Sequence, residues 1–237
     1  MLDFLIDLDT QILLFFNGLH STFFDYFMMA FTGKFIWVPM YATIVYILFR
    51  RYSWKVALCY TIAITTAIAC ADQIGATIIR PAVERLRPTN INNPINTLIH
   101  IVDGYRGGRY GFPSCHAANS FALATFLSLL FAKRRFTTFI FTWAILTAYS
   151  RLYLGVHYPG DLLVGGVIGV FSGWFMFIIS KKIAKELSTP RDEDSNYFND
   201  KISIGKTTFA YQLSDIMIAA GLITTLSIAI YSTFACI

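Results

Sequence analysis

Apolar residues fill six long runs of this chain, and short polar connections separate one run from the next. The runs cover residues 23–49, 54–79, 114–132, 136–154, 160–180 and 211–236. An α-helix of roughly 20 apolar residues crosses the hydrocarbon core of a bilayer, so each run predicts a transmembrane helix. No internal repeat divides the chain. The pattern therefore predicts an all-α membrane protein, with residues 1–237 forming a single domain built as a six-transmembrane-helix bundle.

The segment before the first run, residues 1–20, has a different pattern. Its polar and apolar side chains fall on opposite faces of a helix, and the polar face carries Asp3, Asp7, Thr10 and Gln11. Such a helix lies in the membrane interface with its apolar face toward the lipid. We therefore expect an N-terminal interfacial amphipathic helix. The alternative, a seventh transmembrane helix, is disfavoured because acidic side chains are costly inside a bilayer.

Composition strengthens the membrane interpretation. Hydrophobic residues make up 56% of the chain and charged residues 14%, and the mean hydropathy is +0.56, which is far more apolar than an ordinary soluble domain. The formal net charge of +5 would also suit a nucleic-acid partner. In so apolar a chain it indicates cytoplasmic anchoring charges and an anion site instead. We expect the lipid bilayer as partner and no nucleic acid; the oligomeric state stays open.

Lysine and arginine residues in the connections predict how the bundle is oriented. They are concentrated between the first and second runs, between the third and fourth, and after the fifth. All three connections open on one side, which the positive-inside rule places in the cytoplasm together with a polar loop over residues 186–210. The long loop 80–112 opens on the opposite side, toward the periplasm or cell exterior. Its arginines need a separate reason for lying outside, and anion binding supplies one.

Three short segments concentrate ionisable side chains at the ends of the predicted helices. They are Arg80 to Arg87-Pro88, Pro113-Ser114-Cys115-His116, and Ser150-Arg151 to His157 and Asp161. In a helical bundle all three lie at one depth on the outer face. Pro113 suits a first helical turn, so the next three amides are free to point at an anion. The arginines add planar forks that match phosphate oxygens.

His157 and Asp161 have the spacing of a nucleophile and its orienting group. Asp161 comes one helical turn after His157, so its carboxylate can accept from one imidazole nitrogen and leave the other free to attack phosphorus. His116 comes from a different helix and can protonate the leaving oxygen from the far side. A structural ion network is the alternative, but it would not need two histidines from separate helices. With both histidines accounted for, Cys115 is disfavoured as the nucleophile.

The three segments resemble the signature motifs of the type 2 phosphatidic acid phosphatase superfamily. Its usual patterns are Lys-x6-Arg-Pro, Pro-Ser-Gly-His and Ser-Arg-x5-His-x3-Asp. The resemblance implies a metal-independent phosphatase that works through a phosphohistidine and needs no cofactor. It implies catalytic roles for His157, His116 and Asp161, and phosphate binding by Arg80, Arg87, Ser114, Cys115 and Arg151. Two positions depart from the patterns, because Arg80 stands for lysine and Cys115 for glycine.

The same resemblance also bears on substrate and location. Short chain length and an interfacial first helix look like bacterial members that act on undecaprenyl diphosphate or lipid A phosphate in the cytoplasmic (inner) membrane, with the site facing the periplasm. Phosphatidylglycerol phosphate and phosphatidic acid are the alternative substrates. A non-catalytic lipid-phosphate binder or flippase is disfavoured, because binding alone would need only the arginines. Haloperoxidase chemistry is disfavoured, because the resemblance implies that those members are soluble.

A few further residues carry open alternatives. Asp72 lies within the second run, where we expect it to pair with an arginine or a polar group rather than to act in catalysis. Arg106 and Arg109 are placed either at the substrate headgroup or as solvated loop charges. A series of glycines, which includes Gly165 and Gly169, predicts close packing between helices.

Overall fold

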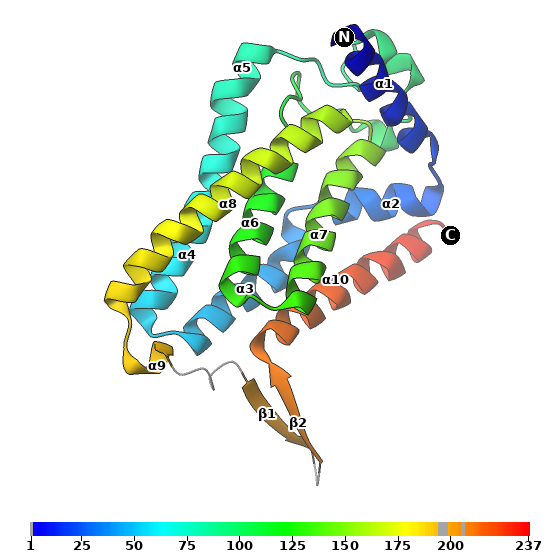
Figure 1. The fold of residues 1–237 in the computed structure, drawn as a ribbon. Helices are drawn as coiled ribbons and strands as arrows, with labels where there is room; N and C mark the ends of the chain where they lie inside the picture. Colours follow the sequence, from blue (N-terminus) through cyan, green and yellow to red (C-terminus); the bar gives the residue numbers. More distant parts are fainter. Residues whose placement is uncertain (1, 194–198, 205–206) are drawn as a thin grey trace.

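The computed structural model describes residues 2–193, 199–204 and 207–237. Its helices form a bundle (Figure 1). The long helices are α1 (Leu2–Gly18), α2 (Thr22–Phe31), α3 (Val38–Arg51), α4 (Trp54–Gln73), α6 (Cys115–Phe131), α7 (Arg134–Tyr153), α8 (Pro159–Leu187) and α10 (Leu213–Ala235). Short elements join them: η1 (Phe35–Trp37), η2 (Ile74–Ile79), α5 (Arg80–Val83), η3 (Pro94–Leu98), η4 (Val102–Gly104), α9 (Pro190–Glu193), and the strands β1 (Asn199–Ile204) and β2 (Thr207–Gln212).

Helices cover most of each of the six apolar runs, with a break in the first, so the predicted helical membrane bundle is confirmed at this level. Among the described residues, three helices are long and apolar enough to cross a membrane: Trp54–Val83, Pro159–Leu187 and Leu213–Ala235. A fourth span results if α2 and the segment Phe35–Arg51 are counted together. Helix α6 has 17 residues and belongs to the shorter apolar helices. The length and hydropathy of the helices thus account for three or four spans.

The first apolar run does not form one continuous helix. Helix α2 ends at Phe31, and the chain resumes at Phe35 after a bend of 70°. Gly33 lies in the break, and Pro39 lies in the first turn of α3, where a missing amide costs nothing. The indole of Trp37 donates to the Phe31 carbonyl at 2.8 Å and joins the two parts. The expectation of a single helix over residues 23–49 is therefore wrong.

Helix α6 lies at the centre of the bundle and contacts α4, α7 and α8. Glycines on one face of α8 allow the closest of these approaches. A Cβ atom on Gly165, Gly169 or Gly173 would collide with backbone carbonyls of Ser114, Ala118 and Ala122. The predicted role of Gly165 and Gly169 in close helix packing is confirmed.

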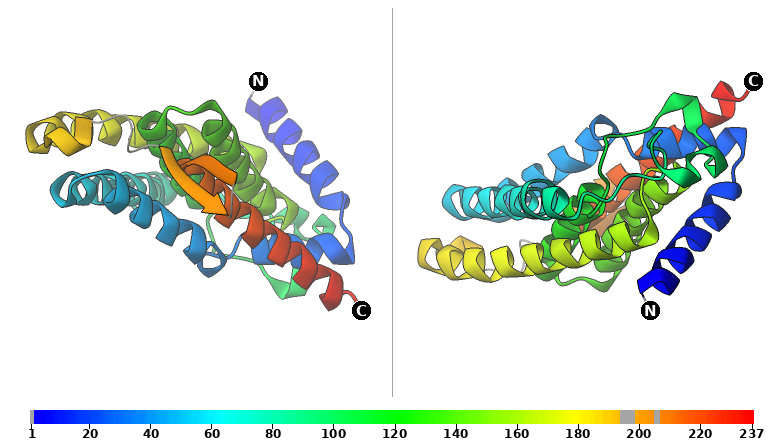
Figure 2. Two further views of the ribbon diagram at one scale, coloured as in Figure 1. Left: turned by 90° about the horizontal axis from the view of Figure 1, so that it is seen from below. Right: turned by 90° about the horizontal axis from the view of Figure 1, so that it is seen from above.

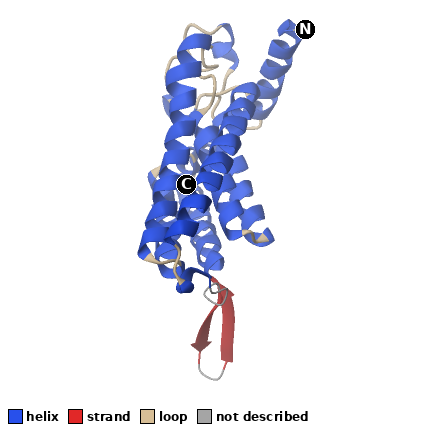
Figure 3. Ribbon diagram, turned by 60° about the vertical axis from the view of Figure 1, so that its left-hand side comes forward, coloured by secondary structure: helices blue, strands red, loops and turns tan. Residues whose placement is uncertain are grey.

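The two ends of the bundle differ in what they carry. Helix α1 and the segment between α5 and α6 gather at one end, whereas the β1–β2 hairpin extends from the other (Figures 1 and 3). Figure 2 views both ends, with the hairpin in front on the left and α1 with the long loop in front on the right. The three basic connections, α3–α4, α6–α7 and the one after α8, lie at the hairpin end.

The predicted polar loop 186–210 contains regular structure. Helix α8 continues to Leu187, α9 comes next, and β1 pairs antiparallel with β2. The Asp192 carboxylate accepts from the Ser53 amide at 2.6 Å, which attaches α9 to the α3–α4 connection. Residues 194–198 and 205–206 of this loop lie outside the described residues.

Candidate active site

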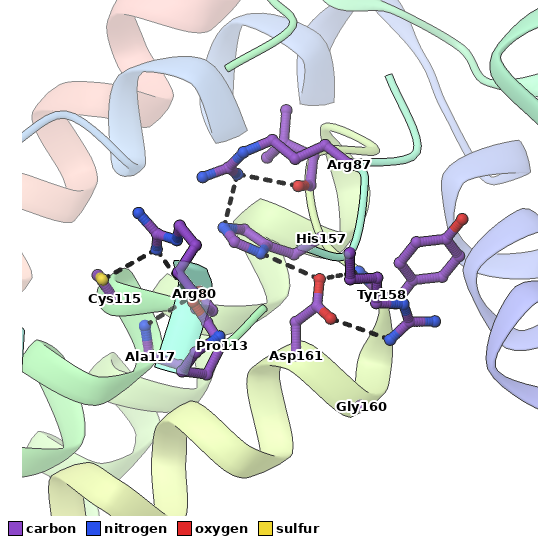
Figure 4. A network of polar contacts seen from close by, with 12 residues as sticks. Arg80, Arg87, Pro113, Cys115, Ala117, His157, Tyr158, Gly160 and Asp161 are labelled. Atoms are coloured by element: carbon purple, nitrogen blue, oxygen red, sulfur yellow. Dashed lines mark hydrogen bonds and ion pairs between the residues drawn. The ribbon is translucent and has the colours of Figure 1, made fainter. Parts of the chain in front are cut away.

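The three predicted segments meet at the α1 end of the bundle. Arg80 lies where the helix Trp54–Val83 ends, and Arg87 lies in the loop after it. Ser114 caps the start of α6, Arg151 lies in the last turn of α7, and His157 lies just before the start of α8. Figure 4 shows His157 between Arg87 and Asp161, with Arg80 and Cys115 on a neighbouring side. Arg87 and His157, which are 70 positions apart in sequence, thus share one small volume.

A π-helix, η2, directly precedes Arg80. The wider turn of a π-helix inserts an extra residue and rotates the next turn of the helix, and such turns are frequent at functional sites. The apolar run 54–79 predicts a helix that ends before Arg80, but the helix continues to Val83. Arg80 is therefore held on helical backbone rather than on a loop.

His157 is held at both ring nitrogens and is 1% exposed. Its Nδ1 lies 3.3 Å from Asp161 Oδ2, and its Nε2 lies 2.7 Å from a terminal guanidinium nitrogen of Arg87. An arginine side chain offers only donors, so Nε2 must be the accepting nitrogen and Nδ1 must carry the proton. This tautomer leaves the lone pair of His157 on Nε2, on the side of the arginines.

Asp161 is fully buried, and its carboxylate contacts three groups. Its carboxylate accepts from the Tyr158 amide at 3.1 Å and from Arg85 at 3.0 Å, in addition to facing His157. As the third residue of α8 it also lies at the positive end of the helix dipole. Asp161 is thus strongly stabilised as the acceptor for the His157 Nδ1 proton.

Arg85 and Asp9 were not among the predicted site residues, yet both support this carboxylate. Arg85 bridges Asp161 and Asp9, with a distance of 2.6 Å to Asp9, and its guanidinium lies 3.7 Å from the Tyr158 ring centre. The Gly160 amide donates to Asp9 at 2.7 Å. These contacts tie α1 to the start of α8. The sequence signal was weak, because Asp9 is one of three acidic residues near the N-terminus and Arg85 is one of several arginines in the loop 80–112.

Electrostatics explain the charge state of the nucleophile candidate. Burial lowers the pKa of His157 well below its usual value, and the charges of Arg87, Arg151 and Arg80 lower it further. Burial, together with the smaller effect of the Arg151 and Arg80 charges, also lowers the pKa of Arg87 to about 10. The imidazole of His157 is therefore neutral at pH 7, and Arg87 is still charged.

The two departures from the family patterns contact each other. A guanidinium nitrogen of Arg80 lies 3.0 Å from the Cys115 sulfur and 3.1 Å from the Pro113 carbonyl oxygen. The longer reach of arginine is therefore matched by the side chain that replaces glycine. In the motif patterns, arginine for lysine at position 80 and cysteine for glycine at position 115 are two separate substitutions. In the structure the two side chains are in contact.

Arg151 is 2% exposed and is anchored from outside the predicted segments. Its terminal nitrogens donate to the Thr32 hydroxyl and the Tyr105 hydroxyl, each at 2.8 Å. The Nε atoms of Arg80, Arg87 and Arg151 are all buried without a hydrogen-bond partner within the described part of the chain. Buried, unpaired charged donors are costly. An anion such as phosphate would satisfy them.

Of the three amides predicted to be free for an anion, the structure leaves two free within helix α6 and engages the third. Pro113 lies before the helix, and Ser114 is its N-cap, with a buried amide that donates to the Asp161 carbonyl at 2.9 Å. The expectation that the Ser114 amide is free is therefore wrong, because α6 and α8 pack closely there. The Cys115 and His116 amides belong to the first helical turn and have no acceptor within their own helix. They are the amides available to an anion.

His116 is the second residue of α6. The charges of Arg151, His157 and Lys34 act on its imidazole. No hydrogen bond of its ring is found among the described residues. Its side chain lines a cavity of about 520 Å³ together with Cys115 and Asp72. Asp72 accepts from Asn119 at 3.0 Å, so the predicted pairing of this membrane-level acid with a polar group is confirmed.

Arg106 and Arg109 differ in their contacts. Arg106 donates to the Thr89 carbonyl at 2.8 Å, and the Thr89 hydroxyl donates back at 2.6 Å. Arg106 therefore holds the loop 80–112 together. The Arg109 guanidinium lies 5.0 Å from the Tyr110 ring centre. The headgroup role considered for both residues stays a prediction.

Gly111 lies directly against the histidine–aspartate pair. A Cβ atom there would come within 3.1 Å of Asp161 Oδ2 and within 3.5 Å of His157 Nδ1. Its amide donates to the Arg85 carbonyl at 2.9 Å, which closes the loop over the pair. No group of three or more side chains with metal-ligand chemistry is found in the described ranges.

Comparisons with known proteins agree with these motifs. The sequence model of the PAP2 superfamily matches residues 54–185. A lipid A 4′-phosphatase of Bacteroides thetaiotaomicron is 53% identical over 232 residues, which are 98% of this chain and 98% of that protein. A lipid A 4′-phosphatase of Porphyromonas gingivalis is 31% identical over 176 residues, 74% of each chain.

Two solved structures share the fold. The crystal structure of Aquifex aeolicus LpxE has a TM-score of 0.52 and 23% identity, and the match covers 74% of this chain and 95% of that one. A transmembrane PAP2-type phosphatidylglycerolphosphate phosphatase from Bacillus subtilis has a TM-score of 0.54 and 18% identity, over 78% of this chain and 89% of that one. With the family match over residues 54–185 and a 53% identical full-length relative, this chain belongs to the PAP2 superfamily and is a membrane-embedded phosphatase.

Proposed function

We propose that this phosphatase transfers a phosphoryl group from a membrane lipid to His157 and then to water, without a metal ion or other cofactor. The observation that carries the proposal is the pair of contacts at the two ring nitrogens of His157, which assign its tautomer. Its Nδ1 proton is directed at the buried Asp161, and its Nε2 lone pair faces the arginines. A neutral imidazole oriented in this way is an activated nucleophile.

In the first step, Nε2 attacks phosphorus as the bond to the lipid oxygen breaks. Arg87 leaves Nε2 and binds a phosphoryl oxygen together with Arg80 and the Cys115 and His116 amides. Arg151 contributes its unpaired Nε. Asp161 stabilises the positive charge that develops on the imidazole. A dianionic phosphate stabilises the protonated form of His116, which then donates its proton to the leaving oxygen.

In the second step, water attacks the phosphohistidine. His116, now neutral, accepts a proton from that water as the nitrogen–phosphorus bond breaks. Phosphate is released, and His157 returns to its neutral tautomer. Positive groups around the five-coordinate phosphorus supply most of the stabilisation that phosphoryl transfer requires.

Lipid A is the proposed substrate, and its 4′-phosphate the proposed position of cleavage. The support is the 53% identity to a lipid A 4′-phosphatase over almost the whole chain. Undecaprenyl diphosphate is the second candidate, since an undecaprenyl-diphosphatase of Sulfolobus acidocaldarius is 28% identical over 152 residues. Phosphatidylglycerol phosphate and phosphatidic acid serve as comparison substrates.

The proposed setting is the inner membrane of a bacterium, with six spans and the site at the periplasmic face. In support, the three basic connections lie at the hairpin end, and the arginine-bearing loop lies at the other. Helix α1 would lie in the interface beside the site, where Asp9 reaches Arg85. Labelling of single cysteines introduced into the loop 80–112 and into α9 of intact cells would test this orientation.

The decisive experiment measures phosphate release by purified protein in detergent with a chelator present. Lipid A, undecaprenyl diphosphate, phosphatidylglycerol phosphate and phosphatidic acid are compared at equal concentration. We expect turnover with the chelator and a preference for lipid A. Strict dependence on an added divalent ion would overturn the phosphohistidine mechanism, and a preference for undecaprenyl diphosphate would overturn the substrate assignment.

A further inference from the structure

A cavity of about 520 Å³ adjoins the site and has two chemically different parts. The part next to the site is lined by Lys34, Asp72, Cys115, His116 and Asn119. The remainder is lined mainly by apolar side chains of α3, α4 and α6 and by Trp143 of α7. Its volume lies within the range of about 300–1,000 Å³ that is typical of ligand pockets.

The position of this cavity relative to the two histidines identifies what it can hold. Phosphoryl transfer needs the attacking and leaving atoms roughly in line on opposite sides of phosphorus. His116 lines the cavity, whereas His157 is not among its lining residues. A lipid that is attacked by His157 and protonated by His116 therefore extends into this cavity.

The polar part has acceptors that the protein does not use fully. The Asp72 carboxylate accepts a hydrogen bond from the Asn119 amide nitrogen and interacts with the Cys115 thiol, whereas a carboxylate can accept about four hydrogen bonds. Asn119 Oδ1 is buried and has no partner within the described part of the chain. A partly buried acid at membrane level and a buried, unpaired amide oxygen both favour donors. Hydroxyl or amide groups of a sugar are donors of this kind.

The apolar part has the length of one lipid leaflet. Its lining along η1 and α3 extends from Trp37 to Leu48, twelve residues that span roughly 17 Å of helix. Half of a hydrocarbon core is about 15 Å thick. Val45 lines the cavity and is also 43% exposed on the outer surface. The cavity therefore opens sideways toward lipid, where an acyl chain can enter.

We propose that this cavity is a leaving-group pocket, in which Asp72 and Asn119 bind hydroxyl or amide groups of a phosphorylated sugar and the apolar part holds one acyl chain attached to that sugar. The pocket makes Asp72 and Asn119 specificity-determining residues for glycolipid phosphates. This inference rests on the proposed lipid phosphatase activity, and it adds what selects the lipid.

Product inhibition tests the polar part separately from catalysis. Dephosphorylated lipid A carries the leaving group without the phosphate, and vanadate occupies the phosphate site without the leaving group. Because each lost hydrogen bond leaves a buried polar group unpaired, D72N and N119L should each weaken inhibition by dephosphorylated lipid A at least about fivefold. Vanadate inhibition should change less than about twofold. Equal weakening of both inhibitors, or of neither, would overturn the proposal.

Filling the sideways opening tests the apolar part. V45W should reduce kcat/KM about tenfold or more for lipid A with long acyl chains and leave short-chain analogues nearly unaffected, because a large side chain shortens the pocket. The matched control is I62W on α4, since Ile62 is 57% exposed and does not line the cavity. Equal losses on long and short chains in V45W would contradict the acyl-chain assignment.

The outcomes separate this inference from the proposed function. If the wild-type protein releases no phosphate from any lipid in the panel, the proposed function itself fails. If it is active but dephosphorylated lipid A does not inhibit it, the leaving-group pocket alone is refuted. A thermal unfolding midpoint close to that of the wild-type protein confirms that each variant is folded.

Discussion

The two histidines of the site stand in opposite environments. His157 is 1% exposed and contacted at both ring nitrogens, and its partner Asp161 is held in turn by Arg85 and the Tyr158 amide. His116 has no ring hydrogen bond among the described residues and lines an open cavity. The histidine proposed as nucleophile is thus held by hydrogen bonds on both sides, while the histidine proposed as general acid faces a cavity. This difference suits a phosphatase, because the phosphate group is the same in every substrate, whereas the lipid that leaves is large and needs space.

The largest effect should come from removing each histidine in turn. H157A should lower kcat at least about 10³-fold, because the imidazole whose lone pair faces the arginines is lost. H116A should cost about 10²- to 10⁴-fold, the usual range for a general acid. Phosphate release from lipid A is the measurement. Labelling with ³²P-lipid should mark the wild-type protein and leave H157A unlabelled. Full activity in H157A would refute the nucleophile assignment.

A smaller effect should come from the contacts behind the nucleophile. R85Q removes the bridge between Asp161 and Asp9, so the carboxylate is less firmly held and kcat should fall about 10- to 100-fold. D9N should act in the same direction but less, since Asp161 keeps Arg85. KM should change little in both, because neither side chain lines the cavity. R134Q, which changes an exposed arginine at the start of α7 at the opposite end of the bundle, is the control. A loss confined to KM would contradict this positioning role.

The contact between Arg80 and Cys115 should show coupling. R80K alone shortens the side chain and leaves the Cys115 sulfur without its donor at 3.0 Å, and C115G alone leaves Arg80 without that partner. Each single change should reduce kcat/KM about three- to tenfold, whereas the double change restores the usual family pair and should recover most of the loss. Steady-state kinetics of the four proteins give the coupling directly. Strictly additive losses would show that the two departures are independent.

The smallest effect should be seen on mild acidification. Burial and the neighbouring arginines lower the pKa of His157 well below 6.5, so the nucleophile stays neutral as the pH falls from 7 to 6. The fall in kcat/KM that protonation of His157 causes should therefore occur well below pH 6.5. Between pH 7 and pH 6, kcat/KM should change less than about twofold. A pH profile of kcat/KM measures this. A midpoint at or above the usual histidine value would show that the imidazole is more exposed than in this structure.

Much of the site could be predicted because its residues occupy fixed positions in short motifs. The spacing of His157 and Asp161 is a local property of the start of one helix, and it survives folding unchanged. The contributions of Asp9, Arg85, Thr32 and Tyr105 could not be predicted, because each depends on contacts between elements distant in sequence. The bend between α2 and α3 was likewise missed, since the run 23–49 is apolar throughout and only Gly33 and Pro39 mark the break.

The amino-acid sequence by itself determined the helical membrane character, the family, and which motif side chains are candidates for the chemistry. These depend on apolar run length and on motif spacing, which do not change with how helices pack. Only the tertiary structure decided that the Ser114 amide donates to the Asp161 carbonyl instead of an anion, that Arg80 contacts Cys115, and that His116, but not His157, lines the cavity of about 520 Å³. The physical reason is that hydrogen-bond partners and cavities are set by the distances between elements, which the order of residues along a chain does not contain.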